Sequence, residues 1–241
     1  MFFEQKYRIQ VRDTRKNTKA TNKGLLGLME DVASLHSSKV GFGIYDMPKT
    51  NLTWLLLGWN LKVYSRPQIE EIVNVKTWSR KIEKYYAYRD FEIRNQEGEL
   101  LAVATSKWIL IDPKNRKVTK VEDFIIDAYE PETEYHVFDD ENIDKLRIPD
   151  DYDSILEYEL ARRDIDLYNH MHNLYYLDLA YEALPEKVYE EDEFNNIRIV
   201  YKREIKPGSK IKCMYKEQNN KNVVVIRNKE SNILHSIIEM W

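Results

Sequence analysis

Apolar residues recur first at helical spacing and then at strand spacing along the first half of the chain. One apolar residue every three or four positions predicts an amphipathic helix over residues 22–36. Four runs that read as strands follow it, at residues 53–63, 71–80, 86–94 and 100–112. The turn at residues 95–99 places Gly98 where a positive φ is needed. The last two strands are therefore expected to form an antiparallel hairpin.

The same order of elements recurs in the second half. An opening run at residues 154–163 and a polar loop lead into a helix predicted over residues 174–184, which Pro185 stops. Strand signals follow at residues 196–204, 210–218, 222–228 and 233–240. The segment between the halves is acidic, carries prolines and has only a weak period. We therefore predict a tandem repeat, with domains at residues 1–125 and 154–241 joined by a linker at 126–153.

Each copy of the repeat has one helix and one set of strands, which can pack as two layers. A helix on the concave face of an antiparallel sheet would bury both its own apolar stripe and the inward face of the strands. This α+β layout is a tandem (double) hot-dog fold, in which each of two antiparallel sheets wraps a central helix. A single hot-dog domain leaves an edge strand unpaired, so we expect the two copies to pair. The chain would then act as a monomeric pseudo-dimer or as part of a homodimer.

Composition narrows the class of protein. The chain has 241 residues, of which 43% are hydrophobic and 12% aromatic, enough for a substantial core. A net charge of −4, from 37 basic and 41 acidic residues, speaks against a nucleic-acid partner. No apolar run approaches the roughly 20 residues of a membrane helix, and the first residues lack an export-signal pattern. We expect a soluble, cytoplasmic protein with no membrane partner.

The single cysteine, Cys213, permits no internal disulfide. It alternates with Ile211 and Tyr215 in a predicted strand, which indicates a core position rather than a reactive one.

Candidate chemistry gathers in the polar loop before the second helix. The loop offers a carboxylate, imidazoles and amides, from Asp166, Tyr168, Asn169, His170, His172 and Asn173. Glu204 adds a second carboxylate further along, within a strand-like run. Hydrolysis of an acyl group needs such a set, because a base must activate water and N–H donors must meet the oxygen that becomes negative. The plainer alternatives are that Asp166 caps the helix, that the histidines are ordinary loop residues and that Glu204 is a strand-end charge.

The pair of histidines also raises the question of a metal site. The spacing of His170 and His172, without a nearby cysteine or an HExxH motif, is weak support for zinc. We predict that the site uses no metal and no cofactor.

Motifs in both halves resemble those of the plant and bacterial acyl-ACP thioesterases. In the first half the similar segments are Met29-Glu-Asp-Val-Ala-Ser-Leu-His36, Gly41-Phe-Gly43 and Leu52-Thr-Trp54. In the second half the family reads Asp-x-Asn-x-His-Val-Asn-Asn, where this chain has Asp166-Leu-Tyr168-Asn-His170-Met-His172-Asn173. The family's Tyr-Arg-Arg-Glu matches Tyr201-Lys-Arg203-Glu204. The family has Asn where this chain has Tyr168.

The resemblance implies hydrolysis of fatty acyl-ACP to free fatty acid and acyl carrier protein (ACP). It implies that Glu204 is the general base and that Asp166 either orients the site or attacks the carbonyl as a nucleophile. His170 would position water or substrate. The backbone N–H groups around His172 and Asn173 lie at a helix N-terminus, which suits an oxyanion.

The departure at Tyr168 leaves one role open. An amide both donates and accepts hydrogen bonds, whereas a phenol offers a single hydroxyl on a longer arm. Asn169 could supply the amide if the loop shifts, or Tyr168 could fill space at the mouth of the site.

The family also places the acyl chain in the first half, between helix and sheet. Met29, Val32 and Trp54 are then candidates for lining that pocket, with core packing as the alternative. We expect the first half to have no equivalent of the polar loop, which would leave it free to hold the chain. The acidic ACP would give a use to the basic residues near the site, Arg162, Arg163, Lys202 and Arg203.

Three other functions are compatible with the same fold. They are an acyl-CoA thioesterase, a non-catalytic acyl-binding module and a dehydratase. The spacing between His170 and Glu204 fits hydrolysis better than elimination.

Overall fold

The computed structural model describes residues 1–139, 143, 145–191 and 193–241. The chain divides into two compact units, Met1–Glu141 and Asn142–Trp241. The division falls inside the predicted linker at 126–153, of which residues 140–142 and 144 lie outside the described residues. The predicted domain bounds stay a prediction.

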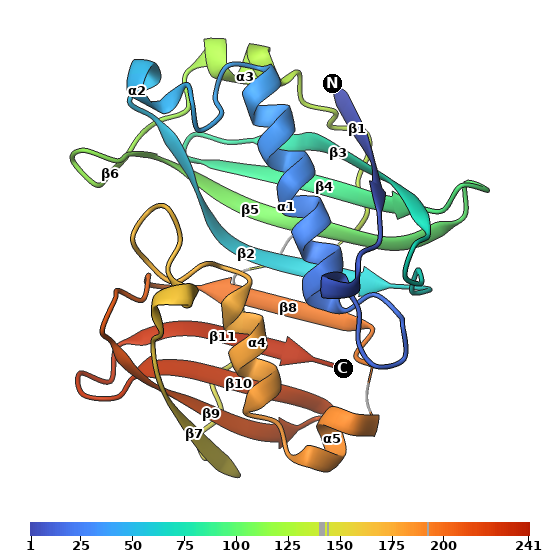
Figure 1. The fold of residues 1–241 in the computed structure, drawn as a ribbon. Coiled ribbons are helices and arrows are strands. Elements are labelled where there is room, and N and C mark those ends of the chain that lie inside the picture. Colours follow the sequence, from blue (N-terminus) through green and yellow to red (C-terminus); the bar gives the residue numbers. More distant parts are fainter. Residues whose placement is uncertain (140–142, 144, 192) are drawn as a thin grey trace. The chain divides into compact units, whose positions relative to one another are not determined.

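The first unit is a long helix lying across an antiparallel sheet (Figure 1). Its strands follow the order β1-β3-β4-β5-β2, and the short β6 pairs with β5. The bounds of its strands are β1 Phe2–Arg8, β2 Thr53–Val63, β3 Ile72–Ile82, β4 Tyr86–Arg94, β5 Leu100–Asp112 and β6 Lys117–Val118. Its helices are a 3₁₀ turn at Val11–Asp13, then α1 Asn22–Lys39, α2 Met47–Thr50 and α3 Asp123–Tyr129.

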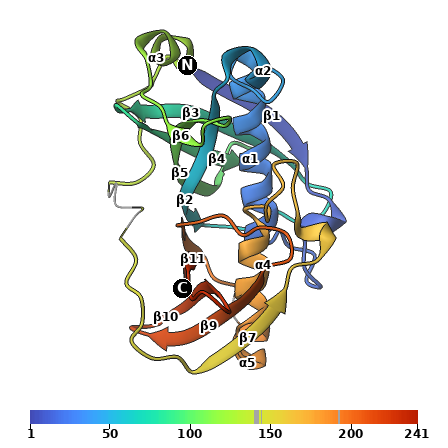
Figure 2. The same ribbon diagram turned by 90° about the vertical axis from the view of Figure 1, so that its left-hand side faces the viewer.

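The second unit repeats this topology. Its strand order is β7-β9-β10-β11-β8, so each strand has a counterpart at the same place in the first sheet. The strands are β7 Ser154–Glu159, β8 Asn196–Tyr201, β9 Lys210–Gln218, β10 Lys221–Asn228 and β11 Leu234–Met240. A 3₁₀ turn at Arg162–Asp164 precedes the helices α4 Tyr175–Glu182 and α5 Glu186–Glu191. Figure 2, turned by 90°, shows the long helix of each unit on one face of its own sheet. Both units have the predicted hot-dog layout.

The central strands match the predictions closely, whereas the outer elements do not. Four strands, β2, β4, β5 and β9, have the predicted bounds, and Gly98 has the expected positive φ of 88° in the β4–β5 turn. Strand β1 was not predicted, because an edge strand with largely exposed side chains shows little alternation. Helix α5 was also not predicted, and α3 crosses the start of the predicted linker. Strand β8 ends at Tyr201, so Glu204 lies beyond the strand rather than within it.

The long helix of the first unit is held by a cap and by an apolar face. The Thr21 hydroxyl accepts a hydrogen bond from Gly24 N at 2.9 Å, which satisfies one of the unpaired N–H groups at the helix start. The buried face of α1 packs against β3 and β1. It consists of Leu25, Leu26, Leu28, Met29, Val32 and Ala33.

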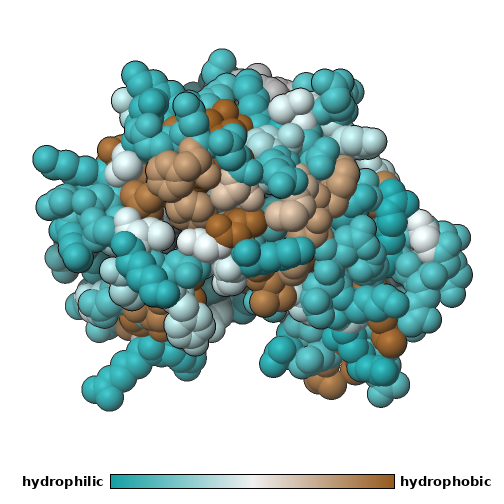
Figure 3. Space-filling model, turned by 90° about the horizontal axis from the view of Figure 1, so that it is seen from above, coloured by the Kyte–Doolittle hydropathy of each residue, from teal (hydrophilic) through white to brown (hydrophobic). Residues whose placement is uncertain are grey.

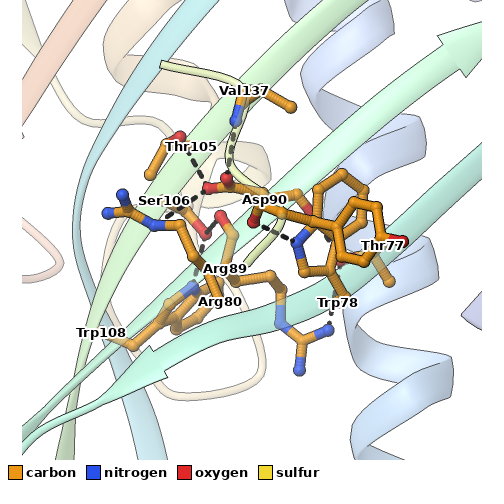
Figure 4. A network of polar contacts seen from close by, with 10 residues as sticks. Thr77, Trp78, Arg80, Arg89, Asp90, Thr105, Ser106, Trp108 and Val137 are labelled. Carbon is orange, nitrogen blue, oxygen red and sulfur yellow. Dashed lines mark hydrogen bonds and ion pairs between the residues drawn. The ribbon is translucent and has the colours of Figure 1, made fainter. Parts of the chain in front are cut away.

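A buried carboxylate ties an irregular segment to the sheet of the first unit (Figure 4). Asp90 on β4 accepts hydrogen bonds from the Thr105 hydroxyl at 2.7 Å and from Val137 N at 3.0 Å. Arg80 Nε lies 3.6 Å from the same carboxylate. Burial raises the pKa of Asp90, and the Arg80 charge opposes that rise. The chain around Val137 is thus anchored to β4.

A second buried contact ties the end of α1 to β4. Arg89 Nη1 lies 2.8 Å from His36 Nδ1, and since a guanidinium only donates, His36 Nδ1 is the acceptor. Phe3 stacks on the His36 ring with centroids 5.5 Å apart. Burial, followed by the Arg89 charge, lowers the pKa of His36 to about 3. His36 is therefore neutral in the folded protein at neutral pH.

Two surface observations complete the fold. No helix among the described residues is long and apolar enough to cross a bilayer. The face seen in Figure 3 is mostly hydrophilic, with smaller apolar areas between the polar side chains.

We predict that His36 makes the first unit less stable in mild acid. Its folded pKa of about 3 lies below the unfolded value of 6.5, so stability is complete above about pH 6.5 and is lost as the pH falls toward 3. The loss approaches about 1.4 kcal/mol per pH unit in that window. Urea unfolding followed by tryptophan fluorescence measures it, because Trp54, Trp59, Trp78 and Trp108 all lie in the first unit.

The matched variant is His36→Gln, whose side-chain oxygen can still accept from Arg89 but does not titrate. Its stability should fall less steeply between about pH 6.5 and about pH 4.5 than that of the wild type. Equal slopes for the two proteins would show that His36 is not the group responsible.

Candidate functional site

A tight turn in the second unit places Asp166 beside His170. Asp166 N donates to His170 O at 2.9 Å, and Asn169 takes the left-handed conformation, with φ of 62°, that closes the turn. The Asp166 carboxylate accepts from Tyr168 N at 2.8 Å and from His170 N at 3.4 Å through Oδ1. The acid therefore fixes the loop that carries the imidazole.

His170 lies between two carboxylates. Its Nδ1 is 3.3 Å from Asp166 Oδ2, and its Nε2 is 4.0 Å from Glu204 Oε2. The side chains of Asp166, His170 and Glu204 are 11%, 16% and 24% exposed, so they are shielded but reachable. The structure brings together the three residues that the sequence singled out as catalytic.

Glu204 reaches the site because the chain after β8 is tied to the loop. Met171 N donates to Ile205 O at 2.8 Å, which draws the residue after Glu204 against the residue after His170. On the other side, Lys202 N and Arg203 N donate to His235 O on β11, at 2.8 and 3.3 Å. Glu204 is thus held at a fixed place outside the regular sheet.

Tyr168 takes part by stacking. Its ring lies over the His170 ring with centroids 5.9 Å apart and an interplanar angle of 15°, and the residue is 44% exposed. No hydrogen bond of its hydroxyl occurs within the described part of the chain. Asn169 is exposed and contributes its backbone conformation to the turn.

The start of α4 offers one backbone donor for an oxyanion. His172 N already donates to Asp164 O at 3.0 Å, and Leu174 N donates to His172 Nδ1 at 3.3 Å. For Asn173 N no acceptor is present among the described residues, and Asn173 O accepts from the Tyr201 hydroxyl at 2.9 Å. Of the two N–H groups predicted for the oxyanion hole, that of Asn173 is the one left to bind a ligand.

The first unit contains the same loop, so the expectation that it has no equivalent is wrong. The backbone donors of the site loop have counterparts 151 positions earlier in the chain, whereas Ile205 and its counterpart Pro67 are 138 positions apart, by subtraction of the residue numbers. Arg15 N donates to Lys19 O at 3.1 Å, as Asp166 N donates to His170 O. Ala20 N donates to Pro67 O at 2.9 Å, as Met171 N donates to Ile205 O. Thr18 has φ of 63°, as Asn169 has 62°.

The side chains at the equivalent positions of the two units differ in charge. By these hydrogen bonds, Arg15 and Lys19 stand where the second unit has Asp166 and His170. Arg66, one residue before Pro67, stands where it has Glu204. Arg66 Nη2 donates to Asn22 Oδ1 at 3.0 Å, and Asn22 is the counterpart of Asn173. The acid–imidazole–acid set therefore occurs in only one of the two equivalent loops.

Two side chains near Glu204 were not predicted. The Tyr176 hydroxyl accepts from Ile205 N at 3.2 Å, and His235 Nδ1 lies 3.0 Å from Arg203 O. Burial, and then the charges of Glu204 and Asp166, raises the pKa of Tyr176, which is 2% exposed. In the sequence, Tyr176 lies in an apolar helical segment and His235 in an apolar strand segment. The hydrophobic pattern around each residue therefore predicts only that it packs in the core.

The remaining predicted residues lie as follows. Met29 and Val32 are fully buried on α1, and Trp54 Nε1 donates to the Tyr129 hydroxyl at 3.0 Å, also in the first unit. The four basic residues predicted to contact a partner are exposed in the second unit; they are Arg162, Arg163, Lys202 and Arg203.

Cys213 is buried within β9, as predicted, and burial raises the pKa of its thiol to about 12.

The described residues include no group of three or more histidine, cysteine or acidic side chains arranged to hold a metal ion. The metal-free site stays a prediction.

The site is suited to activating water. Glu204 can take a proton from a water molecule, the Asp166 carboxylate can hold His170 in one orientation, and Asn173 N can receive a developing negative charge. These are the components needed to add water to a carbonyl group and expel a leaving group.

The sequence matches known families along most of its length. Residues 1–129 match the acyl-ACP thioesterase N-terminal domain, and residues 148–241 match the acyl-ACP thioesterase C-terminal domain. The chain is 26% identical over 218 residues to the oleoyl-acyl carrier protein thioesterase 1, chloroplastic, of Arabidopsis thaliana, covering 84% of this chain and 60% of that protein. It is 28% identical to the oleoyl-acyl carrier protein thioesterase, chloroplastic, of Coriandrum sativum, covering 84% and 59%. The chain spans about 60% of the length of these relatives.

Solved structures share the fold. The 12:0-ACP thioesterase from Umbellularia californica aligns with a TM-score of 0.86 at 20% identity, covering 99% of this chain and 96% of the other. An acyl-ACP thioesterase from Bacteroides thetaiotaomicron aligns with a TM-score of 0.87 at 19% identity, with the same coverage. These alignments confirm the tandem hot-dog fold.

Proposed function

We propose that this chain, which belongs to the acyl-ACP thioesterase family, hydrolyses the thioester of fatty acyl-ACP to free fatty acid and ACP. The observation that carries the proposal is the convergence of Asp166, His170 and Glu204 in the second unit. The equivalent loop of the first unit has Arg15 and Lys19 instead, so hydrolysis is assigned to the second unit.

The geometry supports Glu204 as the general base. A water molecule beside its carboxylate would lose a proton to Glu204 as the water oxygen attacks the thioester carbon. Asn173 N would donate to the carbonyl oxygen as it becomes negative. When the tetrahedral intermediate collapses, the C–S bond breaks and the thiolate of the carrier takes up the proton, which leaves free acid and thiol.

Asp166 fits the role of orienting residue better than that of nucleophile. Its Oδ1 accepts from Tyr168 N and from His170 N, and its Oδ2 faces His170 Nδ1 at 3.3 Å. A nucleophilic oxygen would have to leave these partners before attacking a carbonyl. The same contacts keep His170 turned toward Glu204.

The proposed partner is ACP carrying a fatty acyl chain. The exposed basic residues flank the site in sequence, with Arg162 and Arg163 ahead of the loop and Lys202 and Arg203 ahead of Glu204. An acidic carrier would be attracted to such a surface. We assign the acyl chain to the first unit, where Met29 and Val32 lie on the sheet-facing side of α1. A cytoplasmic location stays a prediction.

We predict that removing either carboxylate abolishes most of the activity. Glu204→Gln and Asp166→Asn should each lower the rate of thiol release from fatty acyl-ACP by at least about a hundredfold, the order expected when a general base or its orienting group is lost. A panel of acyl-ACPs and matched acyl-CoAs, assayed with the wild type and both variants, measures this.

A double variant Arg15→Gln/Lys19→Gln serves as the control, since it alters the equivalent loop of the first unit; it should keep catalytic turnover at the second site. Wild-type rates for Glu204→Gln would contradict the mechanism. A strong preference for the CoA thioesters would instead identify an acyl-CoA thioesterase.

The stacking of Tyr168 predicts that its ring matters and its hydroxyl does not. Tyr168→Phe should keep thiol release within about threefold of the wild type. Tyr168→Ala should lower it by about tenfold or more, because His170 loses the ring that shields it. Tyr168→Asn, which introduces the family's amide, should resemble the alanine variant. A large loss in Tyr168→Phe would show that the hydroxyl takes part in the reaction.

A further inference from the structure

The two copies of the loop differ at two buried positions behind the site. Tyr176 in α4 is the counterpart of Leu25 in α1, by the same displacement of 151 positions that relates the loops. His235 accepts the Lys202 and Arg203 N–H groups at its carbonyl, as Leu101 accepts those of Tyr64 and Ser65. The unit with the acidic site thus has Tyr176 and His235 where the other unit has two leucines.

Each polar side chain contacts the backbone of the segment that carries Glu204. The Tyr176 hydroxyl accepts from Ile205 N at 3.2 Å, directly after Glu204. His235 Nδ1 donates to Arg203 O at 3.0 Å, directly before Glu204. Both residues are nearly fully buried, with exposures of 2% and 5%. Glu204 is therefore held through hydrogen bonds to the residue before it and to the residue after it.

The first unit shows that the fold does not need these polar groups. Pro67 is the counterpart of Ile205 and has no N–H, so Leu25 meets no unpaired donor there. Leu101 replaces the imidazole and remains buried. Two leucines and a proline are thus enough to pack this region in the first unit. The second unit instead buries a hydroxyl and an imidazole, which costs free energy unless both are hydrogen-bonded.

We infer that Tyr176, together with His235, is a positioning residue for Glu204 in the proposed hydrolysis. The inference rests on the proposed function of Glu204 as the base. Tyr176 fixes the peptide bond between Glu204 and Ile205, and His235 fixes the carbonyl that precedes Glu204. A carboxylate beyond the end of a strand would otherwise swing away from His170, and misplacement by about 1 Å can lower a rate about a hundredfold.

The Tyr176 hydroxyl has a second feature that suits this role. It accepts from Ile205 N, and its own proton has no acceptor within the described part of the chain. Burial is the largest cause that raises the pKa of Tyr176, and the charges of Glu204 and Asp166 add to it, so the phenol keeps its proton at neutral pH.

The decisive experiment is a double-mutant cycle with Tyr176→Phe and Glu204→Gln. Tyr176→Phe keeps the ring against Tyr201, with which it makes an edge-on contact at 5.2 Å, and removes only the hydroxyl. We expect kcat to fall by about 10- to 100-fold with KM within about twofold. In the Glu204→Gln background the same change should have almost no effect, because the residue it positions is gone.

A readout independent of turnover tests the contact itself. Hydrogen exchange of the Ile205 amide should be at least about tenfold faster in Tyr176→Phe, whose ring cannot accept from it. Tyr215→Phe is the matched control, since Tyr215 is an equally buried tyrosine whose hydroxyl donates to Asn222 Oδ1 at 2.8 Å, away from Glu204. It should lose a similar stability but keep kcat and the exchange rate of Ile205.

A second variant controls for a loss of folding. Tyr176→Leu/Ile205→Pro/His235→Leu copies all three residues of the first unit and leaves no N–H at position 205 without an acceptor. It should fold, as judged by circular dichroism, and should lose more activity than Tyr176→Phe alone. Full activity of Tyr176→Phe beside an inactive Glu204→Gln would overturn this inference alone, as would equal losses from Tyr176→Phe in both backgrounds. Full activity of Glu204→Gln would overturn the proposed function together with the inference.

Discussion

The hydrogen bond from Met171 N to Ile205 O, at 2.8 Å, is the contact on which the site depends. It joins the loop ahead of α4 to the segment after β8, two pieces of chain that the sheet alone would leave apart. Its counterpart from Ala20 N to Pro67 O does the same in the first unit at 2.9 Å. Because the bond uses only backbone atoms, it forms whatever side chains the two segments carry. The place where three functional groups can meet is thus a property of the fold.

Side chains then decide what that place does. The second unit puts Asp166, His170 and Glu204 on the shared backbone, whereas the first puts Arg15, Lys19 and Arg66 there. Three cations cannot accept a proton from water at neutral pH, whereas a carboxylate beside an imidazole can. Both units therefore have the same loop backbone, but only the second unit carries the groups suited to activating water. This is a case in which function belongs to residues placed on a fold and not to the fold itself.

Much of this could be predicted from sequence, and the failures have physical causes. The inner strands β4 and β5 alternate or carry long apolar runs, so their bounds and their hairpin were clear. Asp166 and His170 stood out because polar residues of these types opened a helix. Glu204 stood out as a carboxylate in a strand-like run, at the spacing from His170 that the family resemblance implies. Strand β1 was missed because an exposed edge buries too little to leave a pattern.

The equivalence of the two loops could not be read from the residues. Of the ten positions 13–22 and 164–173, only the first and last are identical, Asp13 with Asp164 and Asn22 with Asn173. Their common shape comes from backbone hydrogen bonds, which almost any residue can make. Tyr176 and His235 were missed for a related reason, since a buried polar residue on an apolar face looks like core until its partner is known.

The most direct measurement is a structure of the protein with an acyl-ACP in which an amide replaces the thioester. We expect the amide carbonyl oxygen to lie about 3 Å from Asn173 N, with the carbonyl carbon facing the Glu204 carboxylate. A carbonyl group bound at the Arg15–Lys19 loop, or at any point out of reach of Glu204, would contradict it.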